Sequence, residues 1–356
     1  MGLALQLAEH GRCTSMPNPA VGCVLVNNGE IVGEGWHQVA GEPHAEINAL
    51  ALAGNKAKGA TAYITLEPCC HHGRTPPCTE AIIAAGISRV VVAMEDPNPK
   101  VAGNGLQALK SSGIKTESGL LQSQAEALNR GFCYRMRNAR PYVRCKLAMS
   151  LDGRTAMASG ESKWITSQPA REDVQQLRRC SSAIMTGSGT VLIDDPLLTV
   201  RAGDTQHQPL RVILDSRLRI SADARLLSQP GRTLIFTTRH DAQVERLLEQ
   251  AGAELFHVDA VNGLVDLDAV LQELAQQEVN DVFLEAGATL SGAMMQAGLI
   301  NELIIYMAPR LMGDAARGLF VLPGLDKMDQ AIDLDITDIR AVGPDWRMTV
   351  TIKAAS

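Results

Sequence analysis

The stretch from His44 to Gly54, HAEINALALAG, decides how the first half of the chain folds. Its apolar residues recur at three- and four-residue spacing, which predicts a helix. His44 follows Pro43 and falls in the first turn of that helix. Glu46 lies two positions further on, so it points in another direction but stays within one turn of any metal that His44 binds.

Two cysteines further along the chain can join His44. The run 60–66, ATAYITL, has the length and the Thr, Tyr and Ile content of a strand, and it leads into Cys69. Cys78 then opens a second helical run, Thr79 to Gly86. The strand end and the helix start would bring both cysteines next to His44. A helix N-terminus also favours the thiolate form that zinc needs.

Three ligands beside one carboxylate are typical of a catalytic zinc site. Structural sites usually close all four positions with Cys and His, whereas catalytic sites leave one position for water. Zinc lowers the pKa of bound water to roughly 7 from about 9 for the aqueous ion. We therefore predict Zn²⁺ bound by His44, Cys69 and Cys78, with Glu46 as the catalytic group that carries a proton from water to a leaving amine.

The order H-x-E and then P-C-x-x-C is the signature of zinc nucleobase deaminases, but here eight residues separate the two cysteines. Other interpretations remain open. A single His at a helix start is often a cap, and a single Cys is often a small core hydrophobe. A structural zinc site would need a fourth ligand from Cys70, His71 or His72. Because adjacent residues rarely share one tetrahedral ion, we treat Cys70 as a bystander.

Seven motifs spread over nearly the whole chain resemble the bifunctional deaminase–reductase family of riboflavin biosynthesis. They are NPAVG (18–22), HAEINAL (44–50), PCCHHGRTPPC (68–78), DPNPKVAGNG (96–105), KLAMSLDGRTA (146–156), TVLIDDPLLTVR (190–201) and EAGATLSGA (285–293). The long cysteine spacing with HGRTPPC is specific to this family. Two departures are visible: Cys70 stands where Ser is expected, and the first helix begins abruptly.

The resemblance implies two consecutive reactions on a phosphoribosylaminopyrimidine. The first is hydrolytic deamination of 2,5-diamino-6-(5-phosphoribosylamino)pyrimidin-4(3H)-one. The second is NADPH-dependent reduction of the ribosyl chain of 5-amino-6-(5-phosphoribosylamino)uracil to a ribityl chain. It also implies a cytidine-deaminase-like three-layer α/β/α domain over residues 1–138 and a dihydrofolate-reductase-like α/β domain over residues 141–356.

The same match implies further site residues. The cofactor NADPH would contact Ala148, Trp164, Thr190, Asp194, Ser216, Gly287, Ala288, Thr289, Leu290, Ser291, Gly292 and Ala293. The substrates would contact Asn18, Lys146, Ser162, Arg178, Leu198, Arg201 and Glu285. We predict no acid–base residue for the reduction.

The residues themselves leave alternatives open for this second site. Small residues at 287–293 suit either a phosphate at a helix N-terminus or close packing of a helix on a sheet. The planar fork of Arg178 or Arg201 suits a phosphate, but each could instead form a surface ion pair. Lys146 could be a solvated strand residue.

Bulk composition limits the possible functions. A chain of 356 residues favours two domains. A net charge of -6 and an aromatic content of 3% argue against a nucleic-acid partner. The basic joint from Arg130 to Tyr142 could bind nucleic acid or a substrate phosphate, or offset a helix dipole. With no signal peptide or membrane-length apolar run, we expect a cytoplasmic enzyme with a small-molecule substrate, no membrane contact and a homodimeric state.

Strands and helices alternate in both halves, which predicts sheets covered by helices. In the first half we expect, among others, one helix from Gln122 to Met136. In the second half we expect strands at 142–149, 182–186, 210–215, 233–237, 282–285, 302–307 and 347–352, with helices at 169–179, 242–252 and 267–277.

Two other functions could use a zinc site of this kind. A tRNA or free-nucleoside deaminase with an unrelated second domain would favour a basic groove or a short C-x-x-C, and the sequence supports neither. A zinc module that serves only as an interaction scaffold would not need Glu46.

Overall fold

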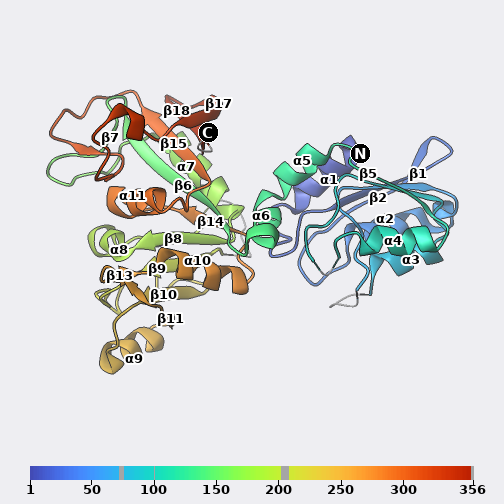
Figure 1. Ribbon diagram of the computed structural model, residues 1–356, viewed down its shortest axis with the longest axis horizontal. Helices are drawn as coiled ribbons and strands as arrows, with labels where there is room; N and C mark the ends of the chain where they lie inside the picture. The colour runs from blue at the N-terminus through green and yellow to red at the C-terminus, as the bar shows by residue number, and fades with distance from the viewer. Residues whose placement is uncertain (72–75, 100, 202–207, 354–356) are drawn as a thin grey trace. The chain divides into compact units, whose positions relative to one another are not determined.

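The chain divides into two compact units, residues 1–140 and 141–356. The computed structural model describes residues 1–71, 76–99, 101–201 and 208–353, and each unit has a main sheet of its own (Figure 1). Among these described residues, no helix combines the length and the apolar character that crossing a membrane requires.

The first unit is built on a five-stranded sheet in the order β2-β1-β3-β4-β5. β1 lies antiparallel to β2 and β3, whereas β3, β4 and β5 run parallel. The strands are β1 (Gly22–Asn27), β2 (Glu30–Trp36), β3 (Thr61–Ile64), β4 (Arg89–Val92) and β5 (Lys115–Ser118). The helices are α1 (Gly2–Gly11), α2 (Ala45–Ala53), η1 (Gly54–Ala57), α3 (Cys78–Ala84), α4 (Asn104–Ser111), α5 (Gln122–Leu128) and α6 (Arg130–Asn138).

Glycines let helices approach both faces of this sheet. A Cβ on Gly22 of β1 would lie 1.9 Å from the carbonyl oxygen of Ala4 in α1. A Cβ on Gly35 of β2 would lie 2.4 Å from the carbonyl oxygen of Ala45 in α2. Gly22 pairs with Trp36, the neighbour of Gly35, so the two glycines face opposite sides. α1 and α2 therefore cover opposite faces of the sheet.

We expect Gly35→Ala to destabilise the first unit. The added methyl group would meet backbone atoms of α2, which cannot move aside as a flexible side chain can. The expected loss in the free energy of unfolding is about 1–3 kcal/mol or more. Hydrogen exchange of peptides from residues 1–140 under increasing urea would measure it. Gly2→Ala is the matched control, because nothing lies within 4 Å of its added Cβ; an equal effect of both substitutions would contradict the prediction.

The prediction of one helix over residues 122–136 was wrong, because the helix breaks at Asn129 into α5 and α6. The Oδ1 atom of Asn129 accepts a hydrogen bond from the backbone N–H of Ala20 at 2.8 Å, and its Nδ2 donates to the Ala20 carbonyl at 2.9 Å. Asn129 is buried. The two hydrogen bonds of Asn129 therefore join the segment before β1 to the turn between α5 and α6.

The second unit is built on a nine-stranded mixed sheet in the order β11-β10-β9-β8-β14-β6-β15-β18-β17. In this order, the strands from β11 to β15 run parallel. β18 lies antiparallel to β15, and β17 lies antiparallel to β18 at the edge of the sheet. They are β6 (Tyr142–Ser150), β8 (Ala183–Gly187), β9 (Leu210–Leu214), β10 (Thr233–Thr237), β11 (Ala253–His257), β14 (Asp281–Leu284), β15 (Glu302–Ala308), β17 (Leu334–Val342) and β18 (Asp345–Ile352).

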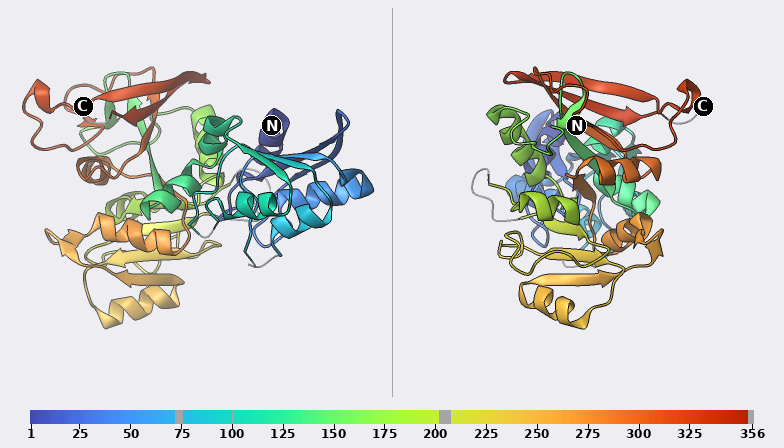
Figure 2. Two further views of the ribbon diagram at one scale, coloured as in Figure 1. Left: turned by 45° about the vertical axis from the view of Figure 1, so that its right-hand side comes forward. Right: turned by 90° about the vertical axis from the view of Figure 1, so that its left-hand side faces the viewer.

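Helices and short ribbons complete this unit. The helices are α7 (Gln168–Arg179), α8 (Ser188–Asp194), α9 (Ala242–Gln250), α10 (Leu267–Gln276), α11 (Ala288–Gln296) and η2 (Met328–Gln330). The ribbons pair β7 (Arg154–Ala156) with β16 (Arg317–Gly318), and β12 (Ala260–Val261) with β13 (Leu264–Val265). α9 lies beside β11 at one end of the sheet, and β17 and β18 lie at the other (Figures 1 and 2).

The centre of the nine-stranded sheet is buried on both faces. β14 is inserted between β8 and β6 and is buried along its whole length. Val143, Val282 and Leu284 have no exposed surface and belong to the main core of the unit. Because β6, β8, β9 and β14 are parallel, their carboxyl ends meet at one edge, where ligands of open α/β sheets usually bind.

Candidate active sites

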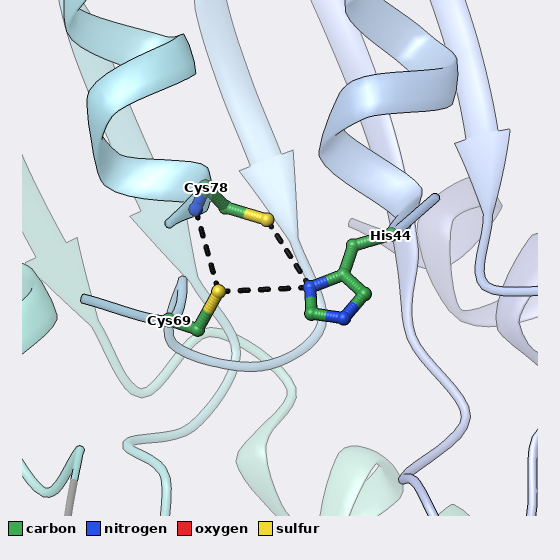
Figure 3. A group of neighbouring side chains, drawn as sticks. All are labelled: His44, Cys69 and Cys78. Carbon is green, nitrogen blue, oxygen red and sulfur yellow. Dashed lines mark hydrogen bonds between the residues drawn. The ribbon is translucent and has the colours of Figure 1, made fainter. Parts of the chain in front are cut away.

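Three side chains from separate elements converge in the first unit (Figure 3). His44 is the N-cap of α2, Cys69 lies in the loop after β3, and Cys78 is the first residue of α3. The Nδ1 atom of His44 lies 3.3 Å from the Sγ of Cys78 and 3.6 Å from the Sγ of Cys69. The backbone N–H of Cys78 donates to the Sγ of Cys69 at 3.3 Å.

The spacing of these donor atoms fits a zinc ion. One nitrogen and two sulfurs lie within 4.8 Å of one another. A tetrahedral zinc ion holds nitrogen and sulfur ligands about 3.6 Å apart. Among the described residues this group contains no fourth His, Cys, Asp or Glu, and Cys70 is not part of it. Of the other two alternative fourth ligands, His71 is not part of the group either, and His72 lies outside the described residues.

The two thiols differ in acidity. The hydrogen bond from the Cys78 thiol, with a further contribution from His44, lowers the pKa of Cys69 to about 4. The hydrogen bond to Cys69 and burial raise the pKa of Cys78. The hydrogen bond with Cys69 also raises the pKa of His44. Of the two cysteines, Cys69 therefore loses its proton more easily. A cation bound between the two sulfurs would also favour the thiolate form of Cys78.

Glu46 lies in the first turn of α2, buried beside the sulfurs. Only 4% of its surface is exposed. Burial, reinforced by the negative charge of Cys69, raises the pKa of Glu46 to about 6. Its carboxyl also shares a hydrogen bond with the Cys78 side chain. The carboxyl group therefore lies next to the three donor atoms without being one of them.

Glu67, which the sequence analysis did not select, positions the loop that carries Cys69. Its buried carboxylate accepts hydrogen bonds from three backbone N–H groups, those of Asp96 at 3.1 Å, Gly103 at 2.9 Å and Leu106 at 3.0 Å. An acidic residue at the end of a strand, directly before Pro-Cys, is the signal that could have identified it.

Asn18 is connected to the three donor residues by His37, a residue that could not be selected from the sequence. Asn18 contacts His37, and His37 contacts His44. The Nδ2 of Asn18 lies 3.0 Å from the Nε2 of His37. The His37 ring contacts the His44 ring edge-on, with 5.1 Å between centroids. His37 is buried, and burial lowers its pKa. The structure therefore links Asn18, proposed to hold the pyrimidine, to the neighbourhood of His44.

In the second unit, Arg178 and Glu285 form a buried ion pair with two hydrogen bonds. The Nε and Nη2 of Arg178 donate to the two carboxylate oxygens of Glu285 at 2.5 and 2.9 Å, and Nη1 donates to the carbonyl of Thr199 at 3.0 Å. The two side chains are only 11% and 14% exposed. All three nitrogens of the Arg178 guanidinium thus donate hydrogen bonds within the protein. A substrate would therefore contact the Arg178–Glu285 ion pair rather than a free guanidinium.

Lys146 and Arg201 add positive charge near this pair. Burial lowers the pKa of Lys146, and the Glu285 carboxylate opposes that shift. Arg201 is exposed, and among the described residues its guanidinium has no hydrogen-bond partner. Leu198 is buried nearby in the chain, with a positive φ of 50°, and Ser162 is half-buried. The cluster therefore offers one exposed guanidinium for a phosphate.

The residues matched to the cofactor lie on several elements. Thr190 and Asp194 belong to α8, and Ala148 belongs to β6. Asp194 pairs with Lys163 at 3.0 Å. Trp164 is 64% exposed, and the guanidinium carbon of Arg171 lies 4.7 Å from the centre of its ring.

Two of the matched segments have specific structural roles. The hydroxyl of Ser216 accepts a hydrogen bond from the N–H of Val265 at 3.0 Å. Gly287 is the N-cap of α11, and Leu290 of that helix lies 3.4 Å from where a Cβ on Gly187 would stand. The starts of α8 and α11 are therefore neighbours.

Only the first residues of α11 are available to a ligand. Gly287 and Thr289 are exposed, and Ala288, Leu290 and Ala293 are half-buried. Ser291 is fully buried, with its hydroxyl 3.6 Å from the thiol of Cys145. A Cβ on Gly292 would lie 2.0 Å from the carbonyl oxygen of Val321. The end of the motif thus serves packing, and its start remains open to a phosphate.

Comparisons with known proteins agree over the whole chain. Residues 1–94 match the family model of the cytidine and deoxycytidylate deaminase zinc-binding region. Residues 141–348 match the model of the RibD C-terminal domain. Riboflavin biosynthesis protein RibD of Escherichia coli is 52% identical, covering 97% of this chain and 96% of that protein. The protein of the same name from Haemophilus influenzae is 49% identical, covering 99% and 96%.

Solved structures agree as well. RibD of Acinetobacter baumannii superposes with a TM-score of 0.92 at 44% identity, over 99% of this chain and 98% of that one. The diaminohydroxyphosphoribosylaminopyrimidine deaminase/5-amino-6-(5-phosphoribosylamino)uracil reductase of Thermotoga maritima gives 0.87 at 31% identity, over 99% and 97%. These matches confirm the predicted cytidine-deaminase-like and dihydrofolate-reductase-like folds. The chain therefore belongs to the RibD family of riboflavin biosynthesis, and it is a bifunctional enzyme with a zinc-binding deaminase domain and a reductase domain.

Proposed function

We propose that residues 1–138 deaminate 2,5-diamino-6-(5-phosphoribosylamino)pyrimidin-4(3H)-one and that residues 141–356 then reduce 5-amino-6-(5-phosphoribosylamino)uracil with NADPH. The two activities in the name of the Thermotoga maritima protein support these substrates. The compact units, residues 1–140 and 141–356, support a division at this point of the chain. The product of the deaminase unit would then be the substrate of the reductase unit.

For the deaminase we propose that His44, Cys69 and Cys78 hold the zinc ion. When bound, zinc would supply an activated water by lowering its pKa. Glu46 is a carboxyl group beside the three donor atoms and is shielded from solvent, so it can take a proton from that water and give it to the leaving amine. Asn18 would bind the pyrimidine ring, with its amide oriented by His37.

For the reductase we propose that the starts of α8 and α11 receive the cofactor. When bound, NADPH would supply a hydride to the sugar carbon, which the protein has to position. Backbone N–H groups at the start of α11 suit a phosphate, because Gly287 leaves them accessible and the helix dipole favours an anion. Arg201 would attract the substrate phosphate, while the Arg178–Glu285 pair would orient the sugar.

The observation that carries the proposal is the convergence of His44, Cys69 and Cys78 beside the buried Glu46, in a chain that also carries a reductase domain. The test is to incubate the purified protein with the diaminopyrimidine, with and without NADPH, and to identify the products by mass. We expect one nitrogen replaced by oxygen without NADPH, and two further hydrogens with it. Release of ammonia without any NADPH oxidation would contradict the second activity.

We also propose that the protein is a dimer. Ile336 and Ile339 are exposed on β17, the edge strand of the nine-stranded sheet, and such an edge can pair with a second copy. Sedimentation equilibrium over a range of concentrations would test this; a monomer throughout would contradict it.

A further inference from the structure

A second group of metal-binding side chains lies at the far end of the sheet of the second unit. His240 precedes the N-cap of α9, Glu245 lies in the first turn of that helix, and His257 is the last residue of β11. α9 and β11 lie side by side in both views (Figures 1 and 2). None of the three residues belongs to the deaminase site or to the residues matched to the reductase site.

The donor atoms of this group lie close to coordination spacing. The Nε2 of His257 is 3.5 Å, and the Nδ1 of His240 is 3.9 Å, from the Oε1 of Glu245. All three atoms lie within 4.8 Å of one another. Nitrogen and oxygen ligands of a tetrahedral zinc ion stand about 3.3 Å apart. The side chain of His240 is 78% exposed, so its ring can turn the remaining distance.

The surrounding contacts keep the three side chains together. The two imidazole rings stack, with centroids 3.9 Å apart and planes at 14°. Because a metal ion binds an imidazole nitrogen in the plane of its ring, the exposed ring of His240 has to turn out of this stack to share an ion with His257. The Oε1 of Glu245 also accepts the backbone N–H of Asp241 at 2.9 Å, which fixes the carboxylate at the start of the helix. The nearby cation Arg239 is paired with Asp241 at 2.8 Å, so its charge is offset locally.

The donor set selects the kind of ion. Two imidazoles and one carboxylate suit borderline transition ions such as Zn²⁺, Ni²⁺ and Cu²⁺, whereas Mg²⁺ and Ca²⁺ prefer oxygen ligands throughout. We propose that His240, Glu245 and His257 form a second divalent-metal site that binds Zn²⁺ and fastens α9 to the edge strand β11. With three protein ligands, the site leaves a position open to water.

The test is a calorimetric titration of Zn²⁺ into the full chain that has first been given one equivalent of zinc. We expect one further equivalent to bind in the wild type. His240→Ala should lose it, and Glu245→Gln should weaken it about tenfold or more, since even outer-shell changes cost roughly ten- to hundredfold in affinity. Glu249→Gln is the matched control, because Glu249 is an exposed carboxylate on the same helix outside the group.

A second readout separates a specific site from general surface binding. Zinc that bridges α9 and β11 should slow hydrogen exchange of their amides in the wild type and the Glu249→Gln variant, and not in His240→Ala. Absence of a second equivalent would overturn the proposal. So would a second equivalent that both the His240→Ala and Glu245→Gln variants keep. These variants leave the deaminase residues unchanged, so the outcome does not depend on that site.

Discussion

Glu46→Gln is expected to abolish ammonia release while the zinc content of the protein stays the same. Glutamine keeps the shape of the side chain but cannot accept and return a proton, and loss of a general acid–base costs about 10²–10⁴-fold in rate. Glu46 is buried beside the sulfurs and is not one of the three donor atoms. Steady-state ammonia release and elemental analysis of the same sample would measure both effects.

Two controls make the Glu46 result specific. Glu30→Gln removes an exposed carboxylate at the start of β2, in the same unit, and should leave the rate unchanged. Reduction of a supplied deaminated pyrimidine should continue in the Glu46→Gln variant. Turnover that survives the substitution would show that Glu46 is not the proton carrier, whereas loss of zinc would show that it is a ligand.

Arg178→Met is expected to lower the free energy of unfolding of the second unit by about 3 kcal/mol, because it leaves the carboxylate of Glu285 buried without its partner. Both hydrogen bonds between the two side chains are lost, and Lys146 remains as the nearby cation. The reductase activity should be lost as well. Urea-dependent hydrogen exchange of peptides from residues 141–356 would measure the stability.

The double variant Arg178→Met/Glu285→Leu separates stability from function. Replacing both charges by apolar groups should recover most of the lost stability without restoring reduction. Arg232→Met is the matched control, since Arg232 forms a similar two-bond pair with Glu254 but on the exposed surface. That substitution should change the free energy of unfolding by less than about 1 kcal/mol. A larger loss in Arg232→Met than in Arg178→Met would contradict the argument.

Alternating strands and helices are a local signal, and from them both units could be predicted to be α/β. The dihydrofolate-reductase-like fold of the second unit came from the family resemblance. What could not be predicted is where tertiary contacts override that signal. Asn129 breaks an otherwise regular helix because its amide is needed by the backbone of Ala20. β17 was missed, because a register shift between Ile336 and Asp338 interrupts the alternation of apolar residues that marks a strand.

The candidate sites divide in a similar way. His44, Cys69 and Cys78 could be selected from residue type and from the order of strand end and helix start, and the structure brings them together. Their role as ligands stays a prediction. Glu67 was missed because its partners are backbone N–H groups far along the chain. In the reductase unit, the residues came from family resemblance, since the Arg178–Glu285 pair has no local spacing rule.

The place of β14 in its sheet has a consequence for synthesis on the ribosome. The strand lies between β8 and β6, although about a hundred residues separate it from β8 along the chain. β6 and β8 cannot be joined in one sheet until β14, which ends at residue 284, has left the ribosome. The reductase unit therefore stays incomplete through most of translation. The deaminase unit has all its strands by residue 118. We therefore expect the amino-terminal unit to fold first, while the nascent remainder needs protection from aggregation.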